Sequence, residues 1–99
     1  MKWWLYGDEG PSVVLLHAFP CDHTLWEDQA EALAKSGFQV HVPDLPGFGE
    51  SDLVAGEPSL AAVVRALRAD ITHPTAVVGL SVGGYLAMEW LRQEKAEGI

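Results

Sequence analysis

The chain has 99 residues and a formal net charge of −8, with only six Lys and Arg residues. This balance argues against nucleic acids and anionic membranes as partners, because both attract clusters of basic side chains. A hydrophobic content of 48% with four tryptophans excludes a disordered tail, since that much apolar surface can offset the entropy of ordering. No apolar run approaches the roughly 20 residues that cross a bilayer, and the amino terminus lacks a signal-peptide core, so we expect a cytoplasmic protein.

At this length the chain forms at most one small domain. Residues 2–6 and 12–17 begin it as two short apolar strands, joined by a turn that contains two glycines and a proline. The second run, Ser-Val-Val-Leu-Leu-His, lacks polar alternation, which is typical of a strand buried on both faces. Residues 38–42 alternate apolar and polar side chains and predict a third strand.

A helix is predicted between the second and third strands, over residues 24–35. Thr24 and Glu27 fit a capping box in which Thr24 is the N-cap. Gly37 follows this helix at the position where a residue with left-handed backbone angles commonly ends a helix. We expect the helix to cover the sheet with one apolar stripe, formed by Trp26, Ala30 and Leu33.

The second half of the chain predicts a helix, a strand and another helix. Residues 59–70 have an apolar stripe at helical spacing, and residues 75–78 form a Val-rich run typical of a strand buried on both faces. Helical spacing then returns over residues 85–92. With right-handed crossovers, this order of elements predicts an α/β fold with a mostly parallel sheet of about four strands and flanking helices.

The last strand and the last helix meet in a Gly-x-Ser-x-Gly sequence, Gly79-Leu80-Ser81-Val82-Gly83. A chain that reverses within two residues strains the dihedral angles of Ser81, and side chains at Gly79 and Gly83 would collide there. The Ser81 hydroxyl would therefore stand clear of the backbone at the carboxyl end of the strand. The amide of Val82 would point toward whatever this hydroxyl attacks. A glycine-rich packing turn with an incidental serine is the alternative.

This strand, turn and helix resembles the nucleophile elbow of the α/β-hydrolase family, in which the serine is the catalytic nucleophile. Residues 17–20, His-Ala-Phe-Pro, are similar to the family's His-Gly-x-Pro loop, although Ala18 replaces the usual glycine. The resemblance implies that the amides of Phe19 and Val82 form an oxyanion hole. Residues 44–51 also match the family's Asp-x-x-Gly-x-Gly-x-Ser loop.

The resemblance further implies that residues 1–99 form the amino-terminal part of an α/β-hydrolase domain, without the carboxyl-terminal strands, catalytic acid and catalytic histidine. Family topology places the four strands in the spatial order first, third, second, fourth. The nucleophile strand then lies at the edge of the sheet, and its backbone groups lack a partner on one side. Such an edge favours pairing with another chain.

A serine hydroxyl needs a histidine base that is itself held by a carboxylate. No histidine follows Ser81 in this chain. His73 precedes the same strand and would lie about 25 Å away, and His41 lies within a strand, short of its carboxyl end. His23 alone is expected on a loop at the correct edge, where capping and packing also explain it. We interpret His17 as a structural residue that holds its loop through the ring, with a substrate contact as the alternative.

No metal and no cofactor are expected. The single cysteine, Cys21, allows neither a disulfide within the chain nor a thiolate metal cluster, and we interpret it as a small loop residue. The alternative interpretation is that Cys21 faces the substrate. His17 and His23 lack a surrounding carboxylate arrangement that would orient them as ligands. The glycine-rich residues 44–51 lack the lysine and the directly following helix of a phosphate-binding loop.

The resemblance implies a serine hydrolase of the esterase or lactonase type that acts on a small-molecule ester or a similar carbonyl substrate. A serine at the elbow argues against the haloalkane dehalogenase and epoxide hydrolase branches, whose nucleophile is an aspartate. Because the acid and the base are missing, we expect the chain alone to be inactive. The alternative is a non-catalytic module that dimerises or binds a partner chain through its open sheet edge.

Overall fold

The computed structural model of the protein describes residues 1–51, 59–72 and 74–98. One sheet is formed by the strands β1 (Trp3–Tyr6), β2 (Ser12–Leu16), β3 (Gln39–Pro43) and β4 (Ala76–Gly79). It is flanked by the helices α1 (Glu27–Lys35), α2 (Leu60–Asp70) and α3 (Val82–Ala96), and α1 is preceded by the short 3₁₀ helix η1 (His23–Trp26). The predicted α/β fold with a four-stranded sheet is confirmed.

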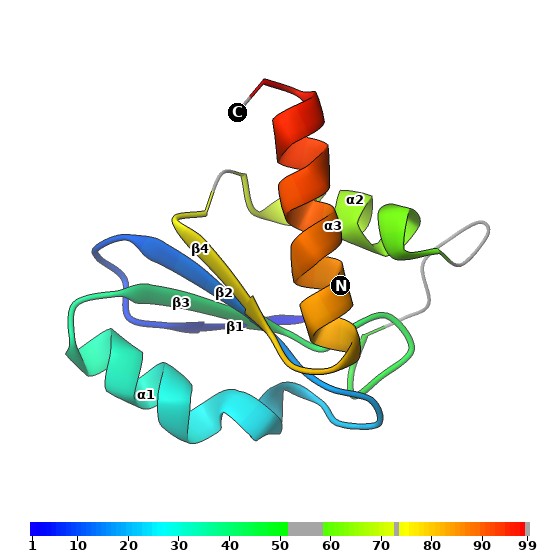
Figure 1. The fold of residues 1–99 in the computed structure, drawn as a ribbon. Coiled ribbons are helices and arrows are strands. Elements are labelled where there is room, and N and C mark those ends of the chain that lie inside the picture. The colour runs from blue at the N-terminus through cyan, green and yellow to red at the C-terminus, as the bar shows by residue number, and fades with distance from the viewer. Residues whose placement is uncertain (52–58, 73, 99) are drawn as a thin grey trace.

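The strands follow the spatial order β1-β3-β2-β4, as expected from the sequence. β2 is parallel to both β3 and β4, whereas β1 is antiparallel to β3. Helix α1 covers one face of the sheet, and α2 and α3 cover the other (Figure 1). This arrangement brings the segments that follow β2, β3 and β4 to the same edge of the sheet, because parallel strands end on the same side.

β2 is the strand around which both halves of the core are packed. Val14 and Leu16 belong to the cluster on the side of α2 and α3, together with Leu86 and Trp90 of α3. Val13 and Leu15 belong to the cluster on the opposite side, which includes residues of α1 and β3. All four β2 side chains are at most 6% exposed. The two-sided burial predicted for this strand is therefore confirmed.

β4 is less buried than its sequence predicts. Val77 packs against the core cluster on the side of α2 and α3, but Val78 is 42% exposed and Ala76 is also exposed. Within the described residues β4 pairs only with β2, so one edge of the strand is open. The expectation that residues 75–78 are buried on both faces is wrong, because α1 packs against β3 and leaves the corresponding face of β4 uncovered.

The start of the α1 segment also differs from the prediction. Asp22 is the N-cap of η1, and its Oδ1 atom accepts hydrogen bonds from the Thr24 amide at 2.9 Å and the Thr24 hydroxyl at 2.6 Å. Helix α1 itself begins at Glu27 without a side-chain cap. The capping box at Thr24 is therefore wrong, since the Thr24 hydroxyl donates to Asp22 instead of accepting from the helix. Gly37 has a φ of +98°, which confirms the predicted left-handed stop.

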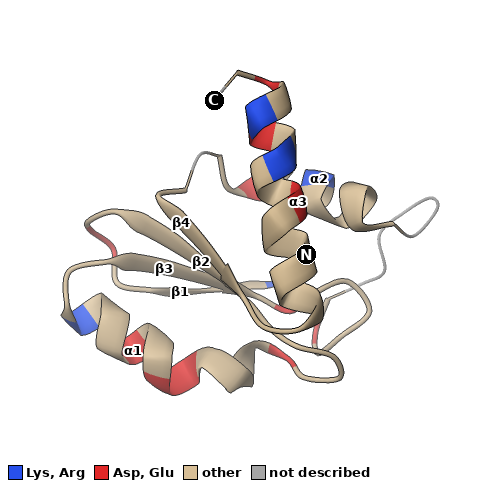
Figure 2. Ribbon diagram, viewed as in Figure 1, with Lys and Arg blue, Asp and Glu red and all other residues tan. Residues whose placement is uncertain are grey.

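The basic residues of α3 lie in its carboxyl-terminal half, and a basic part of α2 lies beside that helix (Figure 2). Arg68 of α2 forms an ion pair with Glu97 at 2.6 Å, and Arg92 of α3 forms one with Glu89 at 2.7 Å. The first of these pairs joins α2 to the end of α3. No helix formed by the described residues is long and apolar enough to cross a membrane.

Candidate active site

Ser81 lies between β4 and α3, at the end of the sheet that is formed by the carboxyl ends of the parallel strands. Its backbone angles are φ 58° and ψ −120°, and it is the only non-glycine residue with a positive φ in the described part of the chain. Such angles cost on the order of 1–3 kcal/mol and persist only where the surrounding structure enforces them. The Ser81 side chain is exposed and does not cap α3, which leaves its hydroxyl accessible to an incoming group.

Two glycines make this bend possible. A Cβ atom on Gly79 would lie 2.0 Å from the carbonyl oxygen of Gly83. A Cβ atom on Gly83 would lie 2.2 Å from the carbonyl oxygen of Leu16. Both distances are far below contact between real atoms, and both neighbours are backbone, so a side chain at either position would displace the chain around Ser81.

The elbow is in contact with the end of β2, shortly before Phe19. The Leu80 amide donates a hydrogen bond of 3.2 Å to the carbonyl oxygen of Leu16. Phe19 is 67% exposed, and its ring meets the ring of Phe48 edge-on with centroids 5.5 Å apart. The structure therefore places Ser81, Val82 and the loop that carries Phe19 at one end of the sheet.

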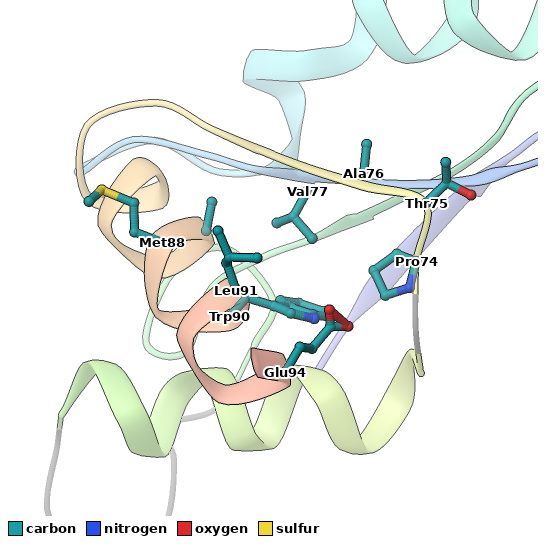
Figure 3. Close-up of a pocket in the computed structure, with 9 residues that line it drawn as sticks. Pro74, Thr75, Ala76, Val77, Met88, Trp90, Leu91 and Glu94 are labelled. Carbon is teal, nitrogen blue, oxygen red and sulfur yellow. The ribbon is translucent and has the colours of Figure 1, made fainter. Parts of the chain in front are cut away.

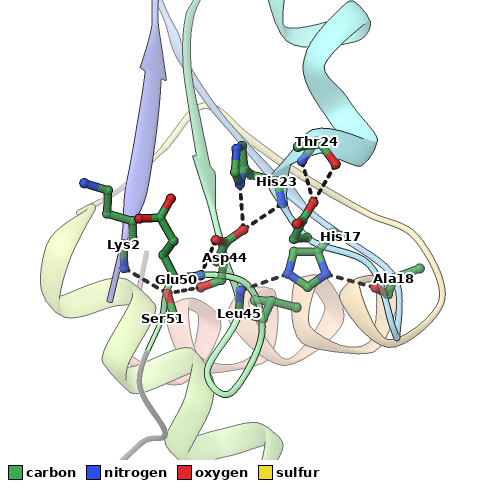
Figure 4. A network of polar contacts seen from close by, with 10 residues as sticks. Lys2, His17, Ala18, His23, Thr24, Asp44, Leu45, Glu50 and Ser51 are labelled. Atoms are coloured by element: carbon green, nitrogen blue, oxygen red, sulfur yellow. Dashed lines mark hydrogen bonds and ion pairs between the residues drawn. The ribbon is translucent and has the colours of Figure 1, made fainter.

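His17 is buried and holds two loops together. Its Nε2 atom accepts a hydrogen bond of 2.9 Å from the Leu45 amide, so its Nδ1 atom carries the proton and donates to the Ala18 carbonyl, also at 2.9 Å. Both ring nitrogens are therefore committed to the backbone (Figure 4). The interpretation of His17 as a structural residue is confirmed.

Asp44 is fully buried and joins the loop after β3 to the start of η1 (Figure 4). Its Oδ1 atom accepts from the amide of His23 at 2.7 Å and from Nδ1 of the same residue at 2.8 Å, and its Oδ2 atom accepts from the Glu50 amide at 2.7 Å. Burial alone would raise the pKa of Asp44, but these three hydrogen bonds hold its pKa below the ordinary value.

The histidines of the described residues do not reach the Ser81 hydroxyl through any hydrogen bond. His23 is hydrogen bonded to Asp44, and its ring stacks on Trp4 with centroids 3.4 Å apart. His41 lies in β3, where its Nε2 atom contacts the Gln39 side chain at 2.9 Å and burial lowers its pKa. His73, also considered from the sequence, lies outside the described residues.

Asp22, His23 and Asp44 each offer a metal-ligand atom within 4.8 Å of the others. The hydrogen bonds between His23 and Asp44, and between Asp22 and Thr24, already account for these side chains. The cluster therefore has a structural explanation that involves no ion.

Sequence reasoning did not find two contacts at this end of the sheet. The Asp44–His23 pair joins residues 21 positions apart, and neither residue carries a local signal for the other. Phe48 was considered only as part of a glycine-rich loop, yet its ring contacts those of His17 and Phe19. An alternating pattern predicts which face of an element is buried, but it contains no information about which two loops meet.

Comparison with known proteins identifies similar sequences and structures. Residues 11–97 match the family model described as alpha/beta hydrolase fold. A pimeloyl-(acyl-carrier protein) methyl ester esterase of Aeromonas hydrophila is 41% identical over 86 residues, which cover 82% of this chain and 32% of the relative. The protein of the same name from Vibrio parahaemolyticus is 36% identical over 87 residues, which cover 88% of this chain and 33% of the relative.

Solved structures are also similar to this chain over nearly all of its length. An esterase from Thermogutta terrifontis superposes with a TM-score of 0.83 and 36% identity over 95% of this chain and 36% of its own. A laboratory-evolved variant of potato epoxide hydrolase superposes with a TM-score of 0.77 and 27% identity over 94% of this chain and 32% of its own. The chain thus spans about one third of the length of the proteins to which it is similar.

Proposed function

Because the chain belongs to the α/β-hydrolase fold family, we propose that residues 1–99 form the amino-terminal part of a serine hydrolase that transfers the acyl group of an ester to water. The similarity to several esterases supports this reaction class. The same fold also occurs in an epoxide hydrolase, so the fold alone does not select the reaction. In this proposal the residue at the elbow selects the reaction, since Ser81 offers a hydroxyl that can form an acyl intermediate.

In this proposal the Ser81 oxygen attacks the ester carbonyl carbon while a base takes the hydroxyl proton. The carbonyl electron pair moves to its oxygen, and the amides of Phe19 and Val82 donate hydrogen bonds to this oxyanion. Collapse of the intermediate breaks the bond to the alcohol, which leaves with the proton, and water then releases the acid from Ser81.

The strongest support is the backbone of Ser81. A non-glycine residue with a positive φ, held between a strand and a helix by two glycines that admit no side chain, is a costly arrangement. A packing turn would be formed more easily with a glycine at position 81. The strained angles are explained if the hydroxyl itself is required at the end of the strand.

The catalytic base and acid are proposed to come from a part of the enzyme outside this chain. Both nitrogens of His17 are engaged, and His23 uses its Nδ1 atom on Asp44. No histidine follows Ser81 in the sequence. We therefore propose that the chain alone positions the nucleophile without activating it.

Labelling with a fluorophosphonate, followed by mass spectrometry of the modified peptide, tests this function. We expect slow modification of Ser81, and a higher rate of modification when free imidazole supplies the absent base. Ser81→Ala should abolish the modification, whereas Ser36→Ala, at an exposed serine beyond α1, should leave it unchanged. Modification spread evenly over several serines, or no modification with imidazole present, would count against the nucleophile.

A second candidate function uses the open edge of β4. A hollow of about 350 Å³ lies beside this strand, between β4 and the outer side of α3, and is lined by Val77, Met88 and Leu91 among others (Figure 3). Met88 is 70% exposed and Leu91 58% exposed, which is unusual for large apolar side chains so close together. A non-catalytic module that pairs through this edge with a second copy of itself would bury these side chains.

A further inference from the structure

Phe48, in the loop after β3, contacts both aromatic rings of the loop after β2. Its ring meets the His17 ring edge-on, with centroids 5.7 Å apart and an interplanar angle of 86°. It meets the Phe19 ring in the same manner, at 5.5 Å and 84°. Aromatic rings favour such edge-on contacts beyond the area that they bury. Phe48 therefore connects the two residues on either side of Ala18.

Phe48 is itself firmly held. Its amide donates a hydrogen bond of 2.9 Å to the Leu45 carbonyl, and its carbonyl accepts one of 3.0 Å from the Ser51 amide. Its side chain packs against the core cluster on the side of α2 and α3. Phe19, in contrast, is 67% exposed. The contact between the two rings thus ties an exposed residue to the core.

The peptide unit between Ala18 and Phe19 carries one of the two proposed oxyanion donors. Its carbonyl oxygen accepts a hydrogen bond of 2.9 Å from Nδ1 of His17 (Figure 4). The Cys21 amide donates a second hydrogen bond to the same oxygen at 2.8 Å. This peptide is trans, so it is planar and directs its N–H away from its C=O. The position of the His17 ring therefore also sets the direction of the Phe19 amide.

We propose that Phe48 is a positioning residue for the Phe19 amide, an inference that rests on the proposed function. On one side its ring holds the His17 ring, which fixes the Ala18 carbonyl. On the other side it holds the Phe19 ring. Without the Phe48 ring, the Phe19 amide would be free to turn away from the oxyanion. The Val82 amide, at the start of α3, would keep its direction.

The order of the Phe19 amide tests this role without any reaction. In the unmodified chain, ¹⁵N relaxation should give this amide an order parameter of about 0.85, as in rigid backbone. Phe48→Leu keeps an apolar side chain but removes the ring, and the order parameter should then fall below about 0.6. Phe48→Tyr restores the ring and should restore the order, while the Val82 amide stays rigid throughout. A Phe19 amide that is mobile in the unmodified chain, or rigid in Phe48→Leu, would overturn the proposal.

Labelling by fluorophosphonate in the presence of imidazole gives a chemical readout of the same role. The rate of Ser81 modification should fall about tenfold in Phe48→Leu, since removal of a whole oxyanion donor costs roughly 10²–10³-fold and a mobile donor still contributes. Phe48→Tyr should recover most of the rate. Ile71→Ala is the matched control, because Ile71 is also half-buried against the same core cluster, but at the end of α2. It should leave the rate unchanged, and an equal fall in this variant would attribute the effect to lost packing and overturn the proposal.

The positioning role and the catalytic proposal fail in different ways. A Phe19 amide that becomes mobile in Phe48→Leu, in a chain whose Ser81 never reacts, would retain the positioning contact and reject the nucleophile. A Ser81 that reacts equally fast with and without the Phe48 ring would reject the positioning role alone. Should Phe48→Leu fail to fold, Phe48→Met also removes the ring with a flexible apolar side chain and is expected to give the same two results.

Discussion

Ser81 holds a backbone conformation that its own side chain disfavours, so the residues around it must enforce that conformation. Gly79 and Gly83 allow the strand and the helix to approach each other, since a Cβ atom on either would overlap a backbone carbonyl. Gly83 also lies against Leu16, which links the bend to the end of the central strand β2. The orientation of one hydroxyl therefore depends on contacts that the start of α3 makes with β4 and β2.

Gly83→Ala is expected to destabilise the fold. The new Cβ atom would lie 2.2 Å from the Leu16 carbonyl oxygen, and because backbone must move to relieve this overlap we expect a loss of about 3 kcal/mol. Gly84→Ala is the matched control. Its Cβ atom would meet nothing closer than the Gly79 carbonyl oxygen at 3.6 Å, and alanine gains up to about 1 kcal/mol over glycine inside a helix. Urea unfolding measures both variants, and equal stabilities would contradict the steric account of the elbow.

At the scale of elements, polar contacts hold the loops at the end of the sheet where Ser81 lies. Asp44 joins the loop after β3 to His23, and the His23 ring stacks on Trp4 of β1. Ser51 accepts a hydrogen bond of 2.9 Å from the Lys2 amide, and its hydroxyl donates to the Asp44 carbonyl. Buried loop backbone requires such partners because it has no ladder of its own. We infer that these contacts keep Phe19 and Phe48 in place.

Asp44 should make stability dependent on acid pH. The pKa of Asp44 is lower in the folded state than its ordinary value of 3.8, so its contribution is complete above that value and is lost as the pH falls through the folded pKa. Asp44→Asn should reduce the free energy of unfolding by about 1–3 kcal/mol near neutral pH. Its unfolding free energy should also fall less steeply below about pH 4.

The measurement is urea unfolding from about pH 7 to about pH 3. Glu31→Gln, at an exposed carboxyl on α1, is the control that removes one negative charge without touching the loops. If Asp44→Asn kept the acid dependence of the unmodified chain, the hydrogen-bonded carboxylate could not be its source.

Local patterns predicted the elements well and their environment less well. The two-sided burial of β2 followed from its uninterrupted apolar residues, and the strand order followed from the resemblance to a family. A similar apolar run at β4 led to a wrong expectation, because the run indicates what a strand could bury and not whether a covering element is present. The predicted capping box at Thr24 was also wrong, because the Thr24 hydroxyl donates to Asp22, an acceptor two residues earlier in the chain.

At the scale of the whole molecule, apolar burial is uneven. β2 is enclosed on both faces, whereas β4 leaves Val78 42% exposed, and the following Leu80 is 50% exposed. On α3, Tyr85 is 64% exposed although its neighbour Leu86 is buried. In a protein three times as long, the natural cover for this edge would be further chain, and in the isolated chain a second copy can take that place.

The open edge of β4 should therefore make the isolated chain associate with itself. Two copies that pair along β4 would satisfy its free amides and carbonyls and remove Val78 from water, so sedimentation velocity should show a dimer that forms with rising concentration. Val78→Lys places a charge on this edge and should shift the chain to monomer. The free energy of unfolding of this variant should change by less than about 1 kcal/mol, because Val78 is already 42% exposed.

Leu5→Lys is the matched control, since Leu5 is 57% exposed on the opposite edge strand β1. A chain that stays monomeric at every concentration would contradict β4 as a pairing edge. Dimerisation that persists in Val78→Lys but is lost in Leu5→Lys would assign the association to another surface.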